Sequence, residues 1–190
     1  MTFPLLDEST APEAALEALK IAKTNFGMIP NVEKVMALTP QLLSGYTYLW
    51  DLFDTTTLTP IERQVVYLTA NFENECNYCV PWHTILAKNV GIEQDDIEAL
   101  RSGAPLTDKK LDTLRTFTRT LIANRGKVSI AELQTFYDAG YTDIQVLEVI
   151  LGLAIKTISN YTNSVAGTPL DQEAEHLRWE KPLVQERVLT

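Results

Sequence analysis

The sequence has few cysteines, histidines and glycines and little positive charge. Its 190 residues include two cysteines, two histidines and eight glycines. Sixteen Lys and Arg residues against 25 Asp and Glu residues give a net charge of −9. Nucleic-acid backbones and anionic membranes bind clustered basic side chains, so we expect neither as a partner. The remaining composition, with 45% hydrophobic and 22% charged residues, is typical of a soluble globular protein.

Long hydrophobic runs and a leader segment are also missing. The most apolar stretch, Val149–Ile155, is far shorter than the roughly 20 residues that a membrane-spanning helix needs. Residues 1–20 have neither the basic start nor the apolar centre of a secretory signal peptide. We therefore expect a cytoplasmic protein without membrane contact. In that reducing compartment, a close pair of cysteines is more often catalytic or metal-binding than a structural disulfide.

No segment alternates apolar and polar residues as a β-strand does, whereas helical periodicity covers nearly the whole chain. Thr59, Pro60 and Glu62 form a helix start with a capping box, and Ser129 forms a second box with Glu132. The last large helix is apolar on nearly all sides between residues 144 and 158, which predicts a buried, central position. The predicted helices cover about residues 13–26, 30–38, 40–53, 60–74, 79–89, 93–101, 108–124, 129–140 and 142–165.

These elements predict an all-α fold, a single-domain helical bundle of about eight or nine helices over residues 1–190. It comprises an N-terminal helical segment (1–57), a core with the cysteines (58–167) and a charged C-terminal arm (168–190). We expect Trp179 in the arm to be exposed and the arm to dock on a neighbouring subunit. The apolar helices near residues 40–53 and 144–158 also predict a homo-oligomer, unless they pack together in the core of one subunit.

Both cysteines lie in one short stretch, Cys76-Asn-Tyr-Cys79. Pro81 fits only the first turn of a helix, so this helix begins near Tyr78 or Cys79. Cys79 then lies at the positive end of the helix dipole, which favours a thiolate and lowers the pKa of the thiol. His83 follows four residues later, on the same face of the helix. A thiol beside an imidazole is an activated nucleophile, and a second thiol can resolve its product.

Three other interpretations of this stretch remain open. Cys76, Cys79 and His83 are a possible set of zinc ligands with His176 as a distant fourth, although structural zinc sites usually use two close pairs of ligands. The two thiols can instead pack in a core as small apolar groups. Finally, His83 can be a hydrogen-bonded core histidine without any link to the thiols.

The pattern E-C-x-Y-C-x-x-x-H, which follows a helix of the sequence TPIERQVVYLTANF, resembles the alkylhydroperoxidase D-like branch of the carboxymuconolactone decarboxylase family. The segment FGMIPNVEKVMALTPQLLSGYTYLW is similar to the N-terminal region of that family. The segment DAGYTDIQVLEVILGLAIKTISNYTNSVAGTPLD is similar to its C-terminal helix. The resemblance thus extends from about residue 20 to residue 172.

This resemblance implies an all-helical fold, a homo-oligomer that is commonly a trimer or hexamer, and a thiol peroxidase activity. Cys79 would attack the peroxide, Cys76 would resolve the product, and His83 would belong to a proton relay. The relay glutamate of the peroxidases corresponds to Gln64 here, and a histidine that many relatives carry in the last helix corresponds to Ser164. We expect no bound cofactor, because thiols alone carry two electrons, and an unidentified dithiol protein as reductant.

Gln64 shares the buried face of its helix with Ile61 and Leu68, by their spacing. Glu62 lies about 200° around the axis and is expected to point to solvent, so it cannot take over the relay. A buried glutamine can orient His83 or a water, or satisfy a backbone group in the core, but it cannot accept and return a proton. The leading hypothesis is therefore an antioxidant peroxidase with slow turnover. The alternatives are a disulfide oxidoreductase or redox sensor, a non-catalytic oligomeric module and, as a poorer match, a decarboxylase-like enzyme.

Overall fold

Residues 2–182 are described by a computed structural model, and within them the chain forms nine α-helices, two 3₁₀ helices and no β-strand. The prediction of an all-α fold is confirmed. The elements are η1 (Glu13–Ala15), α1 (Leu16–Phe26), α2 (Asn31–Met36), α3 (Pro40–Asp54), α4 (Pro60–Glu73), α5 (Cys79–Asn89), α6 (Gln94–Ser102), α7 (Lys109–Ala123), α8 (Ile130–Asp138), α9 (Asp143–Ala166) and η2 (Gln172–Leu177).

The helix starts follow from local capping. The Thr59 hydroxyl accepts a hydrogen bond from the Glu62 N–H, and the Glu62 carboxylate accepts one from the Thr59 N–H at 2.8 Å. Ser129 and Glu132 form the same reciprocal pair at the start of α8, as predicted. Because these bonds join residues three apart, the sequence alone is enough to locate both helix starts.

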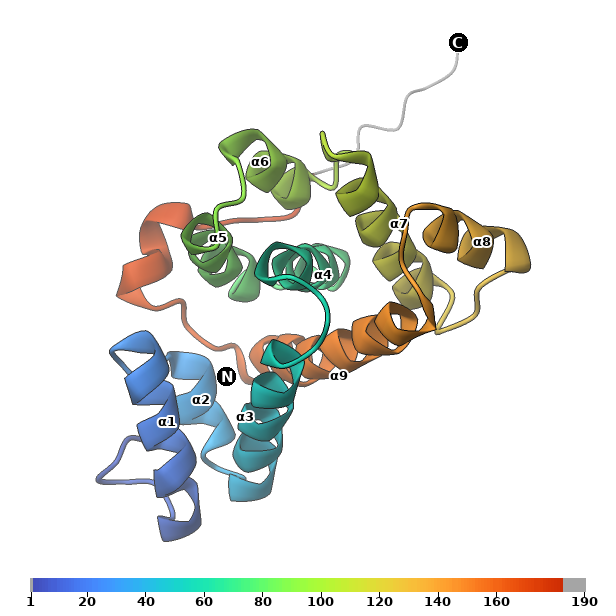
Figure 1. Cartoon of the computed structure of the whole chain (residues 1–190). Coiled ribbons are helices and arrows are strands. Elements are labelled where there is room, and N and C mark those ends of the chain that lie inside the picture. The colour runs from blue at the N-terminus through green and yellow to red at the C-terminus, as the bar shows by residue number, and fades with distance from the viewer. Residues whose placement is uncertain (1, 183–190) are drawn as a thin grey trace.

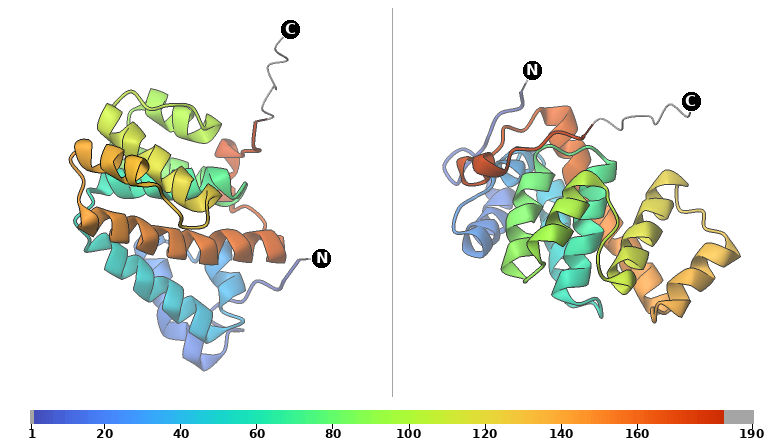
Figure 2. Two further views of the ribbon diagram at one scale, coloured as in Figure 1. Left: turned by 90° about the vertical axis from the view of Figure 1, so that its right-hand side faces the viewer. Right: turned by 90° about the horizontal axis from the view of Figure 1, so that it is seen from above.

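Helix α4 lies at the centre of the fold, in contact with α5, α6, α7 and α9 (Figure 1). Helix α9 runs between this group and a second group formed by α1, α2 and α3 (Figure 2). The close approach of α9 depends on Gly152, where a Cβ atom would lie 2.8 Å from the Phe53 ring and 2.9 Å from Val66. The middle of α9 is therefore held against both α3 and α4.

The predicted central position of α9 is confirmed, but its predicted burial holds for one side only. Ile144, Leu147 and Ile150 are exposed, with 67% of Leu147 accessible to solvent. The main contacts of α9 are with α2, α3 and α4, and its apolar opposite side is left exposed. By length and composition, α9 is the one helix among the described residues that could cross a membrane. This is weak evidence, because core helices of globular proteins meet the same criteria.

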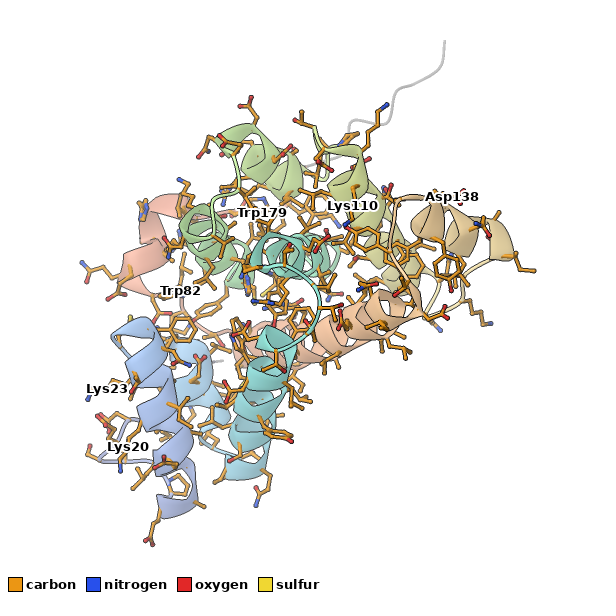
Figure 3. All side chains as sticks on the ribbon, in the orientation of Figure 1. Lys20, Lys23, Trp82, Lys110, Asp138 and Trp179 are labelled. Atoms are coloured by element: carbon orange, nitrogen blue, oxygen red, sulfur yellow. The ribbon has the colours of Figure 1, made fainter. Side chains whose placement is uncertain are left out.

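The predicted exposure of Trp179 is also wrong. Only 6% of this residue is exposed, its indole N–H donates to the Arg101 carbonyl at 2.8 Å, and its ring lies 5.9 Å from that of Phe72 (Figure 3). Lys181 then pairs with Glu75. The described part of the arm, residues 168–182, thus packs on its own chain. Burial of the large apolar surface of the tryptophan ring stabilises this arrangement. The rest of the arm, residues 183–190, lies outside the described residues.

Candidate functional site

The two cysteines lie on a tight turn that leads into α5. Glu75 adopts a left-handed conformation (φ 54°), after which the Cys76 N–H donates to the Asn71 carbonyl at 2.9 Å. Cys79 is the first residue of α5, as predicted. Its N–H donates to the sulfur of Cys76 at 3.2 Å. Both thiols are buried and reduced, and the turn holds one against the backbone of the other.

Two amides from α9 point at the sulfur of Cys79. The Nδ2 atoms of Asn160 and Asn163 lie 3.0 Å and 3.2 Å from Cys79 Sγ. The Asn160 amide is fixed in this orientation, because its Nδ2 also donates to Asn71 Oδ1 and its Oδ1 accepts from Asn74, both at 2.9 Å. Amide N–H groups that donate to sulfur favour the thiolate over the thiol.

The environment separates the pKa values of the two thiols. Burial by itself raises the pKa of Cys79, but a hydrogen bond from Cys76, the positive charge of Lys156 and the two amides outweigh it. Together they lower the pKa of Cys79 from 9.0 to about 6. Burial and the neighbouring Cys79 raise the pKa of Cys76 far above its usual range. At neutral pH, Cys79 is thus the thiolate and Cys76 the thiol, in the order that the helix position predicts.

His83 is held between Gln64 and Lys156. Lys156 Nζ lies 2.9 Å from His83 Nε2, and Gln64 Oε1 lies 2.9 Å from His83 Nδ1. A protonated lysine only donates, so Nε2 accepts, and Nδ1 carries the proton that is donated to Gln64. Burial and the charge of Lys156 lower the pKa of His83 well below its usual value, so the imidazole is neutral. The prediction that Gln64 can orient His83 is confirmed.

His83 does not contact the thiols through a hydrogen bond among the described residues. Both of its ring nitrogens have other partners. The imidazole and Cys79 nevertheless line the same pocket, where Lys156 lies beside both. The link between His83 and Cys79 therefore passes through the charge of Lys156, which the spacing of the two residues in α5 does not reveal.

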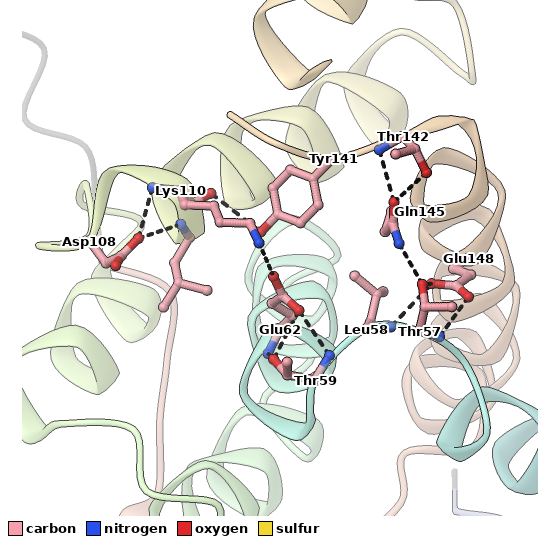
Figure 4. A network of polar contacts seen from close by, with 11 residues as sticks. Thr57, Leu58, Thr59, Glu62, Asp108, Lys110, Tyr141, Thr142, Gln145 and Glu148 are labelled. Atoms are coloured by element: carbon pink, nitrogen blue, oxygen red, sulfur yellow. Dashed lines mark hydrogen bonds and ion pairs between the residues drawn. The ribbon is translucent and has the colours of Figure 1, made fainter. Parts of the chain in front are cut away.

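The prediction that Glu62 points to solvent is wrong, although its exclusion from the site holds. Only 6% of Glu62 is exposed, because its carboxylate folds back onto Thr59 in the capping box and pairs with Lys110 at 3.3 Å (Figure 4). These partners hold the carboxylate at the start of α4. Among the described residues it has no contact with His83.

A small pocket opens beside Cys79. Its walls are largely aromatic and include Phe26, Tyr46, Trp50 and Trp82, and its polar lining includes Glu33, Cys79, His83, Lys156 and Asn163. About 30 Å³ is open to the centre of a water-sized molecule, which is room for one or two waters. Cys76 does not line the pocket. Of the two thiols, Cys79 is therefore the one that a small molecule in this pocket can meet.

The C-terminal segment closes one side of this pocket. The Asp171 carboxylate accepts hydrogen bonds from the Tyr78 hydroxyl, from the Trp82 indole at 2.9 Å and from the Asn31 N–H at 3.1 Å. Tyr78 directly precedes α5, Trp82 lies in its first turn, and Asn31 begins α2. One buried carboxylate thus joins three distant segments around the site. Trp82 lies between α5 and α1 (Figure 3), with its ring 6.0 Å from that of Phe26.

The zinc interpretation of the cysteine stretch finds no support in the geometry. Among residues 2–182, no three His, Cys, Asp or Glu side chains lie close enough together to hold a metal ion. His176, the distant fourth ligand of that interpretation, lies exposed on η2. The groups around Cys79 are two amides, a lysine and the carboxyl group of Glu33. Such a set suits thiolate chemistry better than metal binding.

Sequence reasoning missed Lys156, Asn160, Glu33 and Asp171, and it noted Asn163 only as the neighbour of Ser164. A signal was present for three of these residues. Lys156, Asn160 and Asn163 follow i, i+4, i+7 spacing in a helix that is rich in apolar residues, so they share one face. A polar stripe on a buried helix indicates a polar partner inside the molecule. For Glu33 and Asp171 we find no comparable signal.

Comparison with known proteins gives a family match and several structural neighbours. Residues 40–111, which include both cysteines and His83, match the carboxymuconolactone decarboxylase family. No curated protein sequence matches the chain. The fold is similar to an alkylhydroperoxidase core, a peroxidase-related protein from Ralstonia eutropha, with a TM-score of 0.81 and 18% identity over 90% of this chain and 93% of that one.

Two further solved structures are similar. A peroxidase-related protein from Silicibacter sp. has a TM-score of 0.77 and 19% identity over 92% of each chain. A cysteine-to-alanine variant of the debrominase Bmp8, in complex with 2,3,4-tribromopyrrole, has a TM-score of 0.76 and 13% identity over 93% of this chain and 95% of that one. At these identities the likeness establishes the shared fold and leaves the substrate open.

Proposed function

We propose that this chain, whose residues 40–111 match the carboxymuconolactone decarboxylase family, is a cysteine-based peroxidase that reduces hydroperoxides with Cys79 and Cys76. The observation that carries the proposal is the environment of the Cys79 sulfur. It lies in a small pocket, accepts hydrogen bonds from two amides, and has its pKa lowered to about 6. A thiolate that is stabilised inside a pocket of this size is suited to attack a small electrophile such as a peroxide oxygen.

The first step forms the sulfenic acid. The Cys79 thiolate attacks the terminal oxygen of R–O–OH, the S–O bond forms, and the O–O bond breaks. The electron pair of that bond leaves on the RO⁻ oxygen, which needs a proton to become R–OH. The products are Cys79–S–OH and an alcohol, or water when the substrate is hydrogen peroxide. The small volume of the pocket favours hydrogen peroxide or a hydroperoxide whose organic group remains among the aromatic side chains of the walls.

The second step forms the disulfide. The Cys76 sulfur, which accepts the Cys79 N–H at 3.2 Å, attacks the sulfenic sulfur. Hydroxide leaves with the proton of the Cys76 thiol as water, and the two thiols have supplied the two electrons that reduce the peroxide. A dithiol protein from outside the chain would then reduce the disulfide by thiol–disulfide exchange. The chain needs no bound cofactor for this cycle.

The test is to mix the reduced protein with hydrogen peroxide or tert-butyl hydroperoxide and to follow free thiols and intact mass. We expect the loss of both thiols, the loss of two hydrogens from the chain and one equivalent of alcohol. Cys79→Ser should abolish the reaction. Cys76→Ser should stop at a sulfenic acid that dimedone traps. Consumption of less peroxide by the native chain than by its Cys79→Ser variant plus free cysteine would contradict the proposal.

A second candidate function is a disulfide oxidoreductase or redox sensor that reacts slowly with peroxide. Gln64 is the observation that favours it, because this residue contacts His83 at the position of the family glutamate and does not titrate. In that case Cys79 should exchange rapidly with a small disulfide while hydroperoxides leave it reduced. The same measurement of free thiols and intact mass, with a disulfide in place of peroxide, separates the two functions.

A further inference from the structure

Glu33 is a buried carboxyl group that hydrogen bonds satisfy only in part. It lies on α2, is 4% exposed and lines the pocket that contains Cys79 and Lys156. Its Oε2 atom has no hydrogen-bond partner among the described residues. A buried carboxyl group with an unpartnered oxygen destabilises the folded chain. Such groups are rare, and a catalytic role is one explanation for their presence.

The surroundings of Glu33 hold its proton at neutral pH. Burial raises its pKa from 4.5 to about 8. A hydrogen bond from its own backbone N–H and the charge of Lys156 oppose this rise, whereas the charges of Asp171 and Cys79 add to it. The hydroxyls of Tyr46 on α3 and Tyr78 before α5 also lie close enough to sense its charge. The site thus holds a thiolate and a carboxylic acid together, and the pKa of the acid is the higher of the two.

We propose that Glu33 is the general acid of this site, which donates its proton to the oxygen that leaves when the Cys79 thiolate cleaves a hydroperoxide. This inference rests on the proposed peroxidase function and extends it to a residue outside the cysteine stretch. In the step, the Glu33 O–H bond breaks as the RO–H bond forms. R–OH leaves, Cys79 is oxidised to the sulfenic acid, and Glu33 is left as a carboxylate that regains a proton from solvent.

The other polar groups in the pocket, and Gln64 behind His83, are less suited to this role. Gln64 does not titrate and is occupied by the His83 N–H. His83 is neutral, and its one N–H is directed at Gln64. Lys156 donates to His83 Nε2, and its charge is needed to hold Cys79 as a thiolate. Asn163 also has an oxygen without a partner in this pocket, but an amide has no acidic proton to give. Glu33 is the carboxyl group of the pocket, so it supplies the acid that the missing glutamate at position 64 does not.

The test compares two reactions of Cys79 in Glu33→Gln, which keeps the shape of the neutral acid and removes its proton. Oxidation by tert-butyl hydroperoxide needs an acid for the leaving oxygen, whereas alkylation by iodoacetamide needs only the thiolate. We expect oxidation at pH 7 to slow by about 100-fold and alkylation to stay within twofold of the native rate. Asp51→Asn, a change at an exposed carboxylate near the pocket, is the matched control and should leave both rates unchanged.

The pH profile gives a readout that a purely structural role would not change. Oxidation of native Cys79 should rise through pH 6 as the thiolate forms and fall through pH 8 as Glu33 loses its proton. Glu33→Gln should lose the fall at high pH and keep the rise. Glu33→Asp retains the acid on a shorter side chain, so it should recover the fall and part of the rate.

The outcomes separate this inference from the function on which it rests. If native Cys79 does not react with any hydroperoxide, both proposals are wrong. If native Cys79 reacts and Glu33→Gln keeps its rate and its fall above pH 8, only the assignment of Glu33 is overturned. If Glu33→Gln slows alkylation as much as oxidation, Glu33 acts on the thiolate rather than on the leaving oxygen, and the assignment is also overturned.

Discussion

Single residues control the charge of the reactive sulfur, and Lys156 is the clearest example. Its ammonium group is buried within an apolar helix, donates to His83 and lies above the Tyr67 ring. A buried charge is costly unless other groups use it, and here the Cys79 thiolate and the neutral imidazole do so. Lys156 thus couples two groups that share a pocket but no hydrogen bond.

Lys156→Met should raise the pKa of Cys79, because the nearby positive charge no longer stabilises the thiolate. Alkylation of Cys79 at pH 7 should slow by about tenfold as the thiolate fraction falls. The measurement is the iodoacetamide rate between pH 5 and 10, with Lys88→Met at the exposed end of α5 as control. A midpoint that stays near pH 6 in Lys156→Met would exclude this role.

Gln64→Glu should accelerate oxidation of Cys79 by an organic hydroperoxide between about pH 6 and 8. A carboxylate in place of Gln64 Oε1, which lies 2.9 Å from His83 Nδ1, can accept and return a proton where the amide cannot. Gln64→Met removes the hydrogen bond without adding a carboxylate and should not accelerate the reaction. An unchanged rate in a folded Gln64→Glu variant would show that position 64 has no relay function.

The raised pKa of Glu33 also predicts that Glu33→Gln and the native chain differ in stability in a way that depends on pH. Its folded pKa of about 8 lies above the unfolded value of 4.5, so the unfolded chain loses this proton first as the pH rises. Glu33 therefore lowers the free energy of unfolding increasingly from about pH 4.5 to pH 8. Glu33→Gln should be more stable than the native chain at pH 7, by at most about 3 kcal/mol, and equally stable near pH 4. Denaturant titrations at both pH values check this, and a variant that is less stable at pH 7 would contradict it.

At the level of elements, the site depends on how closely α9 approaches α3 and α4. The stripe of Lys156, Asn160 and Asn163 reaches Cys79 and His83 only because α9 lies against the central helix. Gly152, one turn before Lys156, sets that distance by having no side chain. The position of α9 therefore links the packing of the fold to the pKa of Cys79.

Gly152→Ala should destabilise the fold by about 1–3 kcal/mol, because the new methyl group would overlap Phe53 and Val66. The shift of α9 should also weaken the amide hydrogen bonds to Cys79 and slow its alkylation at pH 6. Gly45→Ala is the control, since it lies within α3 with no atom within 4 Å of the new Cβ. It should be neutral or stabilising. Equal unfolding midpoints for the two variants would disprove the packing argument.

At the level of the whole molecule, the apolar side of α9 is left without cover. Ile144, Leu147 and Ile150 face solvent there, and Tyr161 and Val165 continue the exposed face toward the C-terminal end of the helix. Exposed apolar patches of this kind commonly mark contacts between subunits. The predicted arm contact is not needed for this interpretation, since Trp179 is buried within its own chain.

We therefore propose a homo-oligomer whose contacts include α9. Light scattering at micromolar concentration should give a mass several times the 21.3 kDa of one chain. Leu147→Glu with Ile150→Glu should dissociate it, whereas Glu173→Gln on η2, away from this face, should not. A native mass near that of one chain would contradict the prediction that the apolar face of α9 forms a contact between subunits.

The sequence by itself determined the helices and the chemistry of the cysteine stretch. Capping boxes, Pro81 and the 3.6-residue period act between neighbouring residues, so the starts of α4, α5 and α8 and the order of the two thiol pKa values were predictable. The same spacing placed Gln64 on the buried face, where it contacts His83.

Only the tertiary structure decided which distant side chains meet the thiolate. Asn160, Asn163 and Lys156 come from α9 and Glu33 from α2, and no local pattern states which of their faces meets α5. Sequence reasoning failed at Glu62 and Trp179 for the same reason, since Lys110 and Phe72, which cover them, lie on other elements or far along the chain. The burial of a side chain and the charges near it depend on all of its neighbours in space. Those neighbours are set only when the helices pack, so the order of residues along the chain does not reveal them.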